Sequence, residues 1–200
     1  MLFFLLANIN IMKWINDKTI YIEKVLNELD KLLLSFIRIL EKYFEYVVVA
    51  GYVSILFGRS RATEDIDILI REVNKKSFKK FWKEVNKKFW CLNSNEENEA
   101  FNILKESALR FARKNEIIPN IEVKLCKKKI DFLTLKEKIE VKFSNKRSIF
   151  ISPIEIQIAY KEEVLGSEKD LEDALHLREV FKERIDNNKI EEYKEVIRSE

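Results

Sequence analysis

The stretch GYVSILFGRSRATEDIDILI, residues 51–70, carries most of the chain's structural information. The chain has only three glycines, and Gly51 and Gly58 lie in this stretch, just before Asp65 and Asp67. In a β-strand, residues i and i+2 project from the same face. The two aspartates therefore project together, while the isoleucines between and after them face the core. Unpaired carboxylates in such a position are costly, and a divalent cation would neutralise them.

The residues before the aspartates predict a strand, a sharp turn and a short helix. Residues 46–50, Tyr-Val-Val-Val-Ala, are rich in β-branched valine and read as a buried strand that ends at Gly51. Glycine permits a close approach of the backbone to a ligand, and a helix start favours an anion. We therefore expect Gly51, Tyr52 and Ser54 to contact a phosphate. The spacing matches neither the P-loop nor the dinucleotide-binding glycine motif.

A third acidic residue, Asp131, interrupts the apolar run KKKIDFLTL, which we interpret as a strand over residues 129–133. If that strand lies beside the first acidic strand, Asp65, Asp67 and Asp131 converge. Such a site suits Mg²⁺ or Mn²⁺ and a two-metal phosphoryl transfer. The alternative is structural, because carboxylates on strands are often solvated or paired with lysine.

The ordered pattern of glycine turn, short helix, Arg61, Thr63, the Asp65–Asp67 pair and a later aspartate resembles the nucleotidyltransferase superfamily, whose palm is of the DNA polymerase β type. Within it, the pattern is most similar to the abortive-infection-type nucleotidyltransferase toxins and their relatives. The resemblance implies a small mixed β-sheet flanked by helices, an α/β (α+β) fold with a C-terminal helical bundle. The family usually has Gly-Gly or Gly-Ser at the turn, where this chain has Gly51-Tyr52.

The resemblance also implies roles for individual residues. The three aspartates would hold the metal, and Gly51 with the residues after it would contact the triphosphate. Arg61 or Thr63 would support the loop or contact a phosphate. Apart from the resemblance, we expect Lys161 to bind the γ-phosphate if the tail folds over the core; the alternative is a solvated lysine. The implied reaction transfers a nucleoside monophosphate from an NTP to an RNA, a protein or a small molecule and releases pyrophosphate. The alternative is a non-catalytic partner or antitoxin-like binding protein on the same scaffold.

The rest of the chain predicts mainly helices. We divide the whole chain into a helical lead-in (1–45), a nucleotidyltransferase core (46–150) and a helical C-terminal region (151–200). Residues 1–11 read as a packed N-terminal segment or as an upstream extension. Further expected elements are helices over 18–45, 74–90 and 101–114, a strand over 121–125, a short strand or hairpin arm within 141–151, and tail helices broken at Gly166 and ending with 188–198.

Composition limits the alternatives. The 200 residues are 36% charged with a net charge of +3, so any nucleic-acid affinity must come from a local patch. The Lys- and Glu-rich, Gly-poor composition is typical of high-temperature proteins. One histidine excludes catalysis that needs two, and two cysteines without zinc spacing indicate ordinary thiols. Without a membrane-spanning or signal-like segment, we expect a cytoplasmic protein; the oligomeric state stays open.

Overall fold

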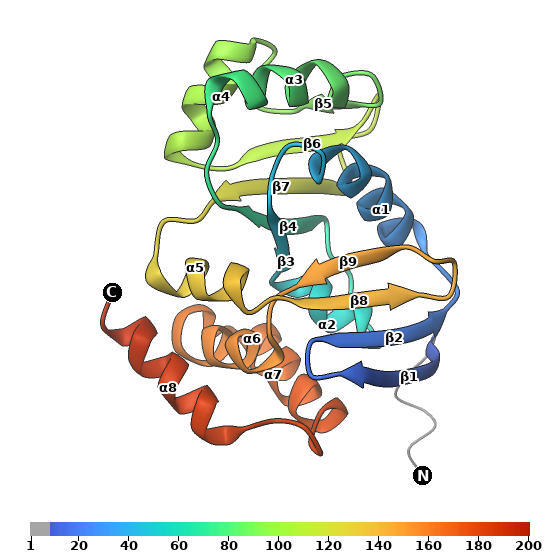
Figure 1. Ribbon diagram of the computed structural model, residues 1–200, viewed down its shortest axis with the longest axis vertical. Coiled ribbons are helices and arrows are strands. Elements are labelled where there is room, and N and C mark those ends of the chain that lie inside the picture. Colours follow the sequence, from blue (N-terminus) through green and yellow to red (C-terminus); the bar gives the residue numbers. More distant parts are fainter. Residues whose placement is uncertain (1–8) are drawn as a thin grey trace.

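The computed structural model describes residues 9–200 and has a mixed nine-stranded sheet, with strand order β1-β2-β8-β9-β3-β4-β7-β6-β5 within that range (Figure 1). The strands are β1 (Ile9–Asn16), β2 (Thr19–Lys24), β3 (Tyr46–Val49), β4 (Asp65–Ile70), β5 (Phe89–Cys91), β6 (Leu109–Arg113), β7 (Asn120–Leu125), β8 (Ile139–Phe143) and β9 (Ser148–Ile151). The helices are α1 (Glu28–Leu40), α2 (Gly51–Leu56), α3 (Lys75–Val85), α4 (Glu97–Glu106), α5 (Lys129–Lys136), α6 (Ile154–Tyr160), a π-helical turn η1 (Lys161–Leu165), α7 (Glu168–Val180) and α8 (Asn187–Arg198).

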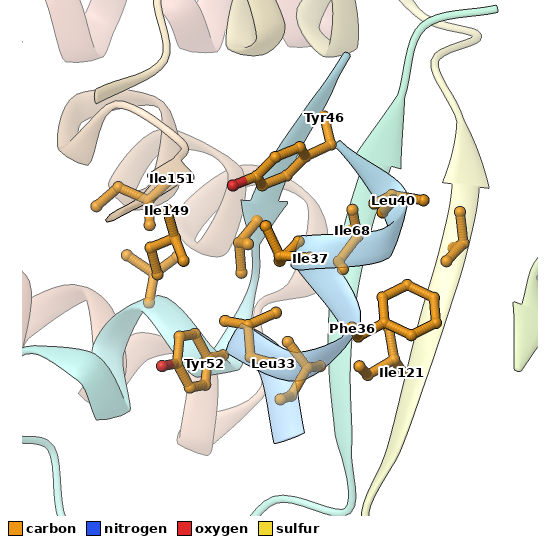
Figure 2. Close-up of a cluster of buried hydrophobic side chains, with 14 of the residues drawn as sticks. Leu33, Phe36, Ile37, Leu40, Tyr46, Tyr52, Ile68, Ile121, Ile149 and Ile151 are labelled. Carbon is orange, nitrogen blue, oxygen red and sulfur yellow. The ribbon is translucent and has the colours of Figure 1, made fainter. Parts of the chain in front are cut away.

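The central strand β4 separates a buried face from a polar one. Ile66, Ile68 and Ile70 are at most 1% exposed and face the core, while Asp65 and Asp67 lie on the other face. Helix α1 contributes to the same core: its Leu33 and Phe36 belong to one buried cluster with the isoleucines of β4 (Figure 2). This alternation follows directly from the two-residue period of a strand.

The C-terminal helices gather at one end of the sheet, beside α5 (Figure 1). Helix α7 contacts α2, and α8 contacts both α5 and α6. The rings of Phe57 and Phe181 meet edge to face with centroids 4.7 Å apart, and His176 Nε2 lies 3.0 Å from the Phe57 carbonyl oxygen. The tail is thereby packed onto helix α2 and onto Phe57, the residue that ends it.

The mixed α/β fold with C-terminal helices is confirmed. The elements that the glycine and aspartate stretch predicts form as expected: strand β3, the short helix α2 and strand β4. Strand β7, the hairpin β8–β9, the helix break at Gly166 and the last helix α8 also lie where the sequence placed them. No helix within residues 9–200 is long and apolar enough to cross a membrane.

The predicted helix over residues 18–45 is wrong in its first half, so the lead-in is not wholly helical. Residues 9–24 form the antiparallel pair β1–β2, and β2 also pairs with β8 in parallel. Only then does α1 begin, at Asn27, whose side chain accepts from the Asp30 N–H while the Asp30 carboxylate accepts from the Asn27 N–H. This capping box fixes the helix start. The expected packed segment 1–11 falls mostly outside the described residues.

Two further predictions were wrong. The helix expected over 101–114 begins earlier, as α4, and its second half is strand β6, which pairs with β7. The strand expected over 129–133 is the helix α5. A short apolar run suits either a strand or a buried helix, and here the packing of α5 against β3, β4 and α8 decides.

Candidate active site

A cavity of about 510 Å³ lies over the polar face of β4. Its walls come from six parts of the chain: the β3–α2 turn, the α2–β4 loop, β4, the strands β6 and β7, helix α5, and the tail from the end of β9 to the start of α7. The volume is within the range of small-molecule sites, which run from roughly 300 to 1,000 Å³. Of the residues predicted from sequence, it is lined by Gly51, Arg61, Thr63, Asp65, Asp67, Asp131 and Lys161.

Asp65 and Asp67 project into this cavity from one face of β4, as predicted. In the parallel pairing of β4 with β7, Asp65 lies opposite Asn120 and Asp67 lies opposite Glu122. The Thr63 hydroxyl donates to the Asp65 carbonyl oxygen at 3.1 Å and lies 3.2 Å from its carboxylate. Thr63 therefore helps to fix Asp65 at the N-terminal end of β4.

Glu122 is the acidic residue that the neighbouring strand contributes, and the sequence reasoning missed it. Lys124 Nζ lies 2.6 Å from Asp67 Oδ1 and 2.9 Å from Glu122 Oε2, while Arg110 Nε lies 2.6 Å from Glu122 Oε1. Burial raises the pKa of Asp67, and Lys124 offsets part of that rise. Burial also acts to raise the pKa of Glu122, but Lys124 and Arg110 outweigh it and lower the pKa.

Asp131 lines the same cavity but not from a strand, which corrects the prediction. It lies in the first turn of α5, and its Oδ2 accepts hydrogen bonds from the Lys127 N–H at 2.9 Å and the Lys128 N–H at 3.0 Å. A carboxylate at the third helical position is favoured because it reaches back to backbone N–H groups at the helix start and complements the positive end of the helix dipole. The place beside Asp67 that we assigned to Asp131 belongs to Glu122.

The carboxylates do not form a ready-made metal cage. Within residues 9–200, no three or more His, Cys, Asp or Glu side chains are grouped closely enough to hold an ion by themselves. Asp65 and Asp67 nevertheless fit Mg²⁺ or Mn²⁺, because Mg²⁺ is usually held by one or two carboxylates together with substrate phosphates. Burial raises the pKa of Asp67, so a cation close to this carboxylate favours its charged form, as Lys124 already does in part.

The turn between β3 and α2 brings an arginine against the backbone. A Cβ atom at Gly51 would lie 1.9 Å from Arg61 Nη2, so a larger residue there would push this guanidinium, the far end of a flexible side chain, away from the backbone. The preceding Ala50 has φ 59° and ψ −139°, a backbone conformation that glycine adopts far more easily. Gly51 therefore lets the Arg61 guanidinium lie against the backbone, and the strained residue is Ala50.

Tyr52 and Ser54 do not line the cavity, although the sequence placed them among the phosphate contacts. The Tyr52 ring lies in the core beside Leu33 (Figure 2), and its hydroxyl donates to Asp30 Oδ1 at 2.7 Å. Lys24 Nζ lies 2.9 Å from the other oxygen of Asp30. The Tyr52 side chain therefore leaves the cavity free. The Ser54 hydroxyl is fully buried and has no hydrogen-bond partner in the described part of the chain.

A buried cluster of charges closes the tail side of the cavity. Lys161 is 1% exposed, and its Nζ lies 2.9 Å from Asp173 Oδ2 and 3.3 Å from Asp170 Oδ1. Arg61 Nη2 lies 3.2 Å from the same Asp173 oxygen. The fully buried Asp173 thus joins a tail lysine to the loop arginine that covers Gly51, so the tail forms part of the site.

Comparison of the sequence with protein-family models and with curated protein sequences finds no match. Among solved structures, the fold is similar to the crystal structure of an antigenic nucleotidyltransferase-like protein from Paracoccidioides brasiliensis. The TM-score is 0.48 with 12% sequence identity, over 82% of this chain and 83% of that chain. A likeness at this level leaves the function to be argued from the residues of the site.

Proposed function

We propose that the protein is a metal-dependent nucleotidyltransferase that moves a nucleoside monophosphate from an NTP to an acceptor and releases pyrophosphate. The observation that carries this proposal is the placement of Asp65 and Asp67 on one face of β4, inside a cavity that also contains the Gly51 turn. The motif from Gly51 to Asp67, with its resemblance to the superfamily, supports the same reading.

The chain's own residues would bind and position the substrate. Asp65 and Asp67 would hold Mg²⁺ or Mn²⁺, which when bound supplies charge neutralisation at the phosphates. Arg61, Lys161 and Lys169 line the same cavity as Gly51 and would face the negative triphosphate. Asp131 would help to fix the α5 wall rather than ligate the ion, because its carboxylate already caps that helix. Catalysis would then consist of positioning and electrostatic stabilisation.

A second function is favoured by the ammonium of Lys124, which lies between Asp67 and Glu122. A protein that neutralises its own carboxylates in this way needs no metal to be stable. The second candidate is therefore a non-catalytic binding or antitoxin-like partner protein on the same scaffold. It predicts no Mg²⁺-dependent binding of nucleotide.

Transfer of label separates the two candidates. The protein is incubated with Mg²⁺, each α-³²P-labelled NTP and, in turn, total RNA or cell protein, and the products are separated on gels. We expect a labelled acceptor with the wild type, and loss of label in both Asp65→Asn and Asp67→Asn. Glu64→Gln is the matched control, because Glu64 is the neighbouring carboxylate outside the cavity and should leave labelling intact. Labelling that persists in the Asp67→Asn variant would contradict the assignment.

A further inference from the structure

The polar strand face offers few free carboxylate oxygens for a metal. Both oxygens of Glu122 are already paired with cations, Oε1 with Arg110 and Oε2 with Lys124, and the Glu122 side chain is 9% exposed. Asp131 Oδ2 is engaged by two backbone N–H groups. Asp67 Oδ1 is paired with Lys124. The strand-face oxygens without a cation partner are therefore the carboxylate of Asp65 and the second oxygen of Asp67.

Lys124 reaches its position because of the sheet register. It lies two residues after Glu122 on β7, on the same strand face, and Glu122 lies opposite Asp67. The ammonium thus bridges two carboxylates that face each other across neighbouring strands. A divalent ion shared by the same two oxygens would have to displace it, against the repulsion between like charges at close range.

We infer that Lys124 is a built-in cation that takes the place of a second metal, so that the site holds one divalent ion rather than two. The inference rests on the proposed function and specifies the number of divalent ions that this function uses. The single ion belongs to Asp65 and the free oxygen of Asp67, and it arrives with the nucleotide. The Lys124 ammonium keeps Asp67 and Glu122 together and supplies the positive charge between them.

The test is the number of Mn²⁺ ions bound per bound nucleotide. Protein is dialysed to equilibrium against saturating Mn²⁺ with a non-hydrolysable analogue of ATP or, separately, of CTP, and both bound species are quantified. We expect a ratio of one for the wild type and of two for Lys124→Met, where Asp67 and Glu122 become available. Lys124→Arg, which keeps the cation, is expected to stay at one. Lys136→Met is the control, because Lys136 is exposed and does not line the cavity.

The outcomes separate the inference from the proposed function. A ratio of two in the wild type, or of one in a folded Lys124→Met variant, overturns the role of Lys124 while leaving the nucleotidyltransferase proposal standing. If neither the wild type nor any variant binds nucleotide and Mn²⁺, both the inference and the proposed function are overturned. If Lys124→Met fails to fold, the wild-type ratio still decides, because the inference requires it to be one.

Discussion

Replacing Asp173 with asparagine should weaken the fold strongly, because Asp173 is the shared anion of a buried cluster. It is fully buried, and both Lys161 and Arg61 pair with its Oδ2. Removing one partner of a buried ion pair typically costs about 3–5 kcal/mol, because the other charge is left uncompensated. Lys161 keeps Asp170 at 3.3 Å, so we expect the lower end, about 3 kcal/mol of unfolding free energy.

The assay is equilibrium unfolding in urea, followed by circular dichroism and fluorescence. With a slope of roughly 1–3 kcal/mol per molar urea, the midpoint should fall by about 1–3 M. Glu172→Gln is the matched control. Glu172 directly precedes Asp173 in the sequence and pairs with Arg59. The Glu172 side chain is 55% exposed, so removing its charge should cost less than about 1 kcal/mol of unfolding free energy.

A double-mutant cycle tests the cause. Lys161→Met removes the buried ammonium and keeps a side chain of similar length. The pair Asp173→Asn with Lys161→Met should be more stable than the sum of the single losses predicts, by about 1–3 kcal/mol, which is the range for directly contacting residues. The reasoning is refuted if Asp173→Asn is as mild as Glu172→Gln, or if the two losses simply add.

Three further predictions concern the core, the turn after β3 and a histidine of the tail. Tyr52→Phe removes the hydroxyl that donates to Asp30 and should cost about 1–3 kcal/mol of unfolding free energy, because it leaves a buried charged acceptor short of one bond, while NTP affinity measured by calorimetry stays unchanged. Ala50→Gly should raise the urea midpoint, since relief of about 1–3 kcal/mol of backbone strain outweighs the entropy cost of glycine; an unchanged or lower midpoint would argue against strain. Burial lowers the pKa of His176 below its usual 6.5, so the unfolded chain takes up a proton first and stability should fall as the pH drops through 6.5. His176→Gln should lose less stability than the wild type over the same pH range, and parallel pH profiles for the two proteins would contradict this origin.

The sequence was sufficient for the centre of the sheet, because the signals there are local. Scarce glycines mark the turn, and the alternation of Asp65 and Asp67 with isoleucines reports directly which face of β4 is polar. The same signal was available for Glu122 and Lys124, which alternate with Ile121 and Val123 in β7. They were missed because their importance lies in the pairing of β7 with β4, and register across strands distant in sequence is not a local property.

The errors occurred where a short pattern fits two structures. The run around Asp131 is apolar enough for a buried strand, yet it packs as α5 and uses the aspartate as a helix cap. Ile20 and Ile22 suit both a helical period and the two-residue period of β2, and the partners β1 and β8 decide between them. The orientation of Tyr52 depends on Asp30 and Lys24, more than 20 residues earlier in the chain.

The central claim is that Asp65 and Asp67 together bind a divalent cation and a nucleotide. Its most direct test is the melting temperature of the wild type, Asp67→Asn and Glu64→Gln with ATP or CTP, in the presence of Mg²⁺ or of EDTA. We predict that Mg²⁺ and nucleotide together stabilise the wild type and Glu64→Gln, and that this stabilisation disappears with EDTA or in Asp67→Asn. Equal stabilisation of Asp67→Asn, or no stabilisation of the wild type by any NTP with Mg²⁺, would contradict the account.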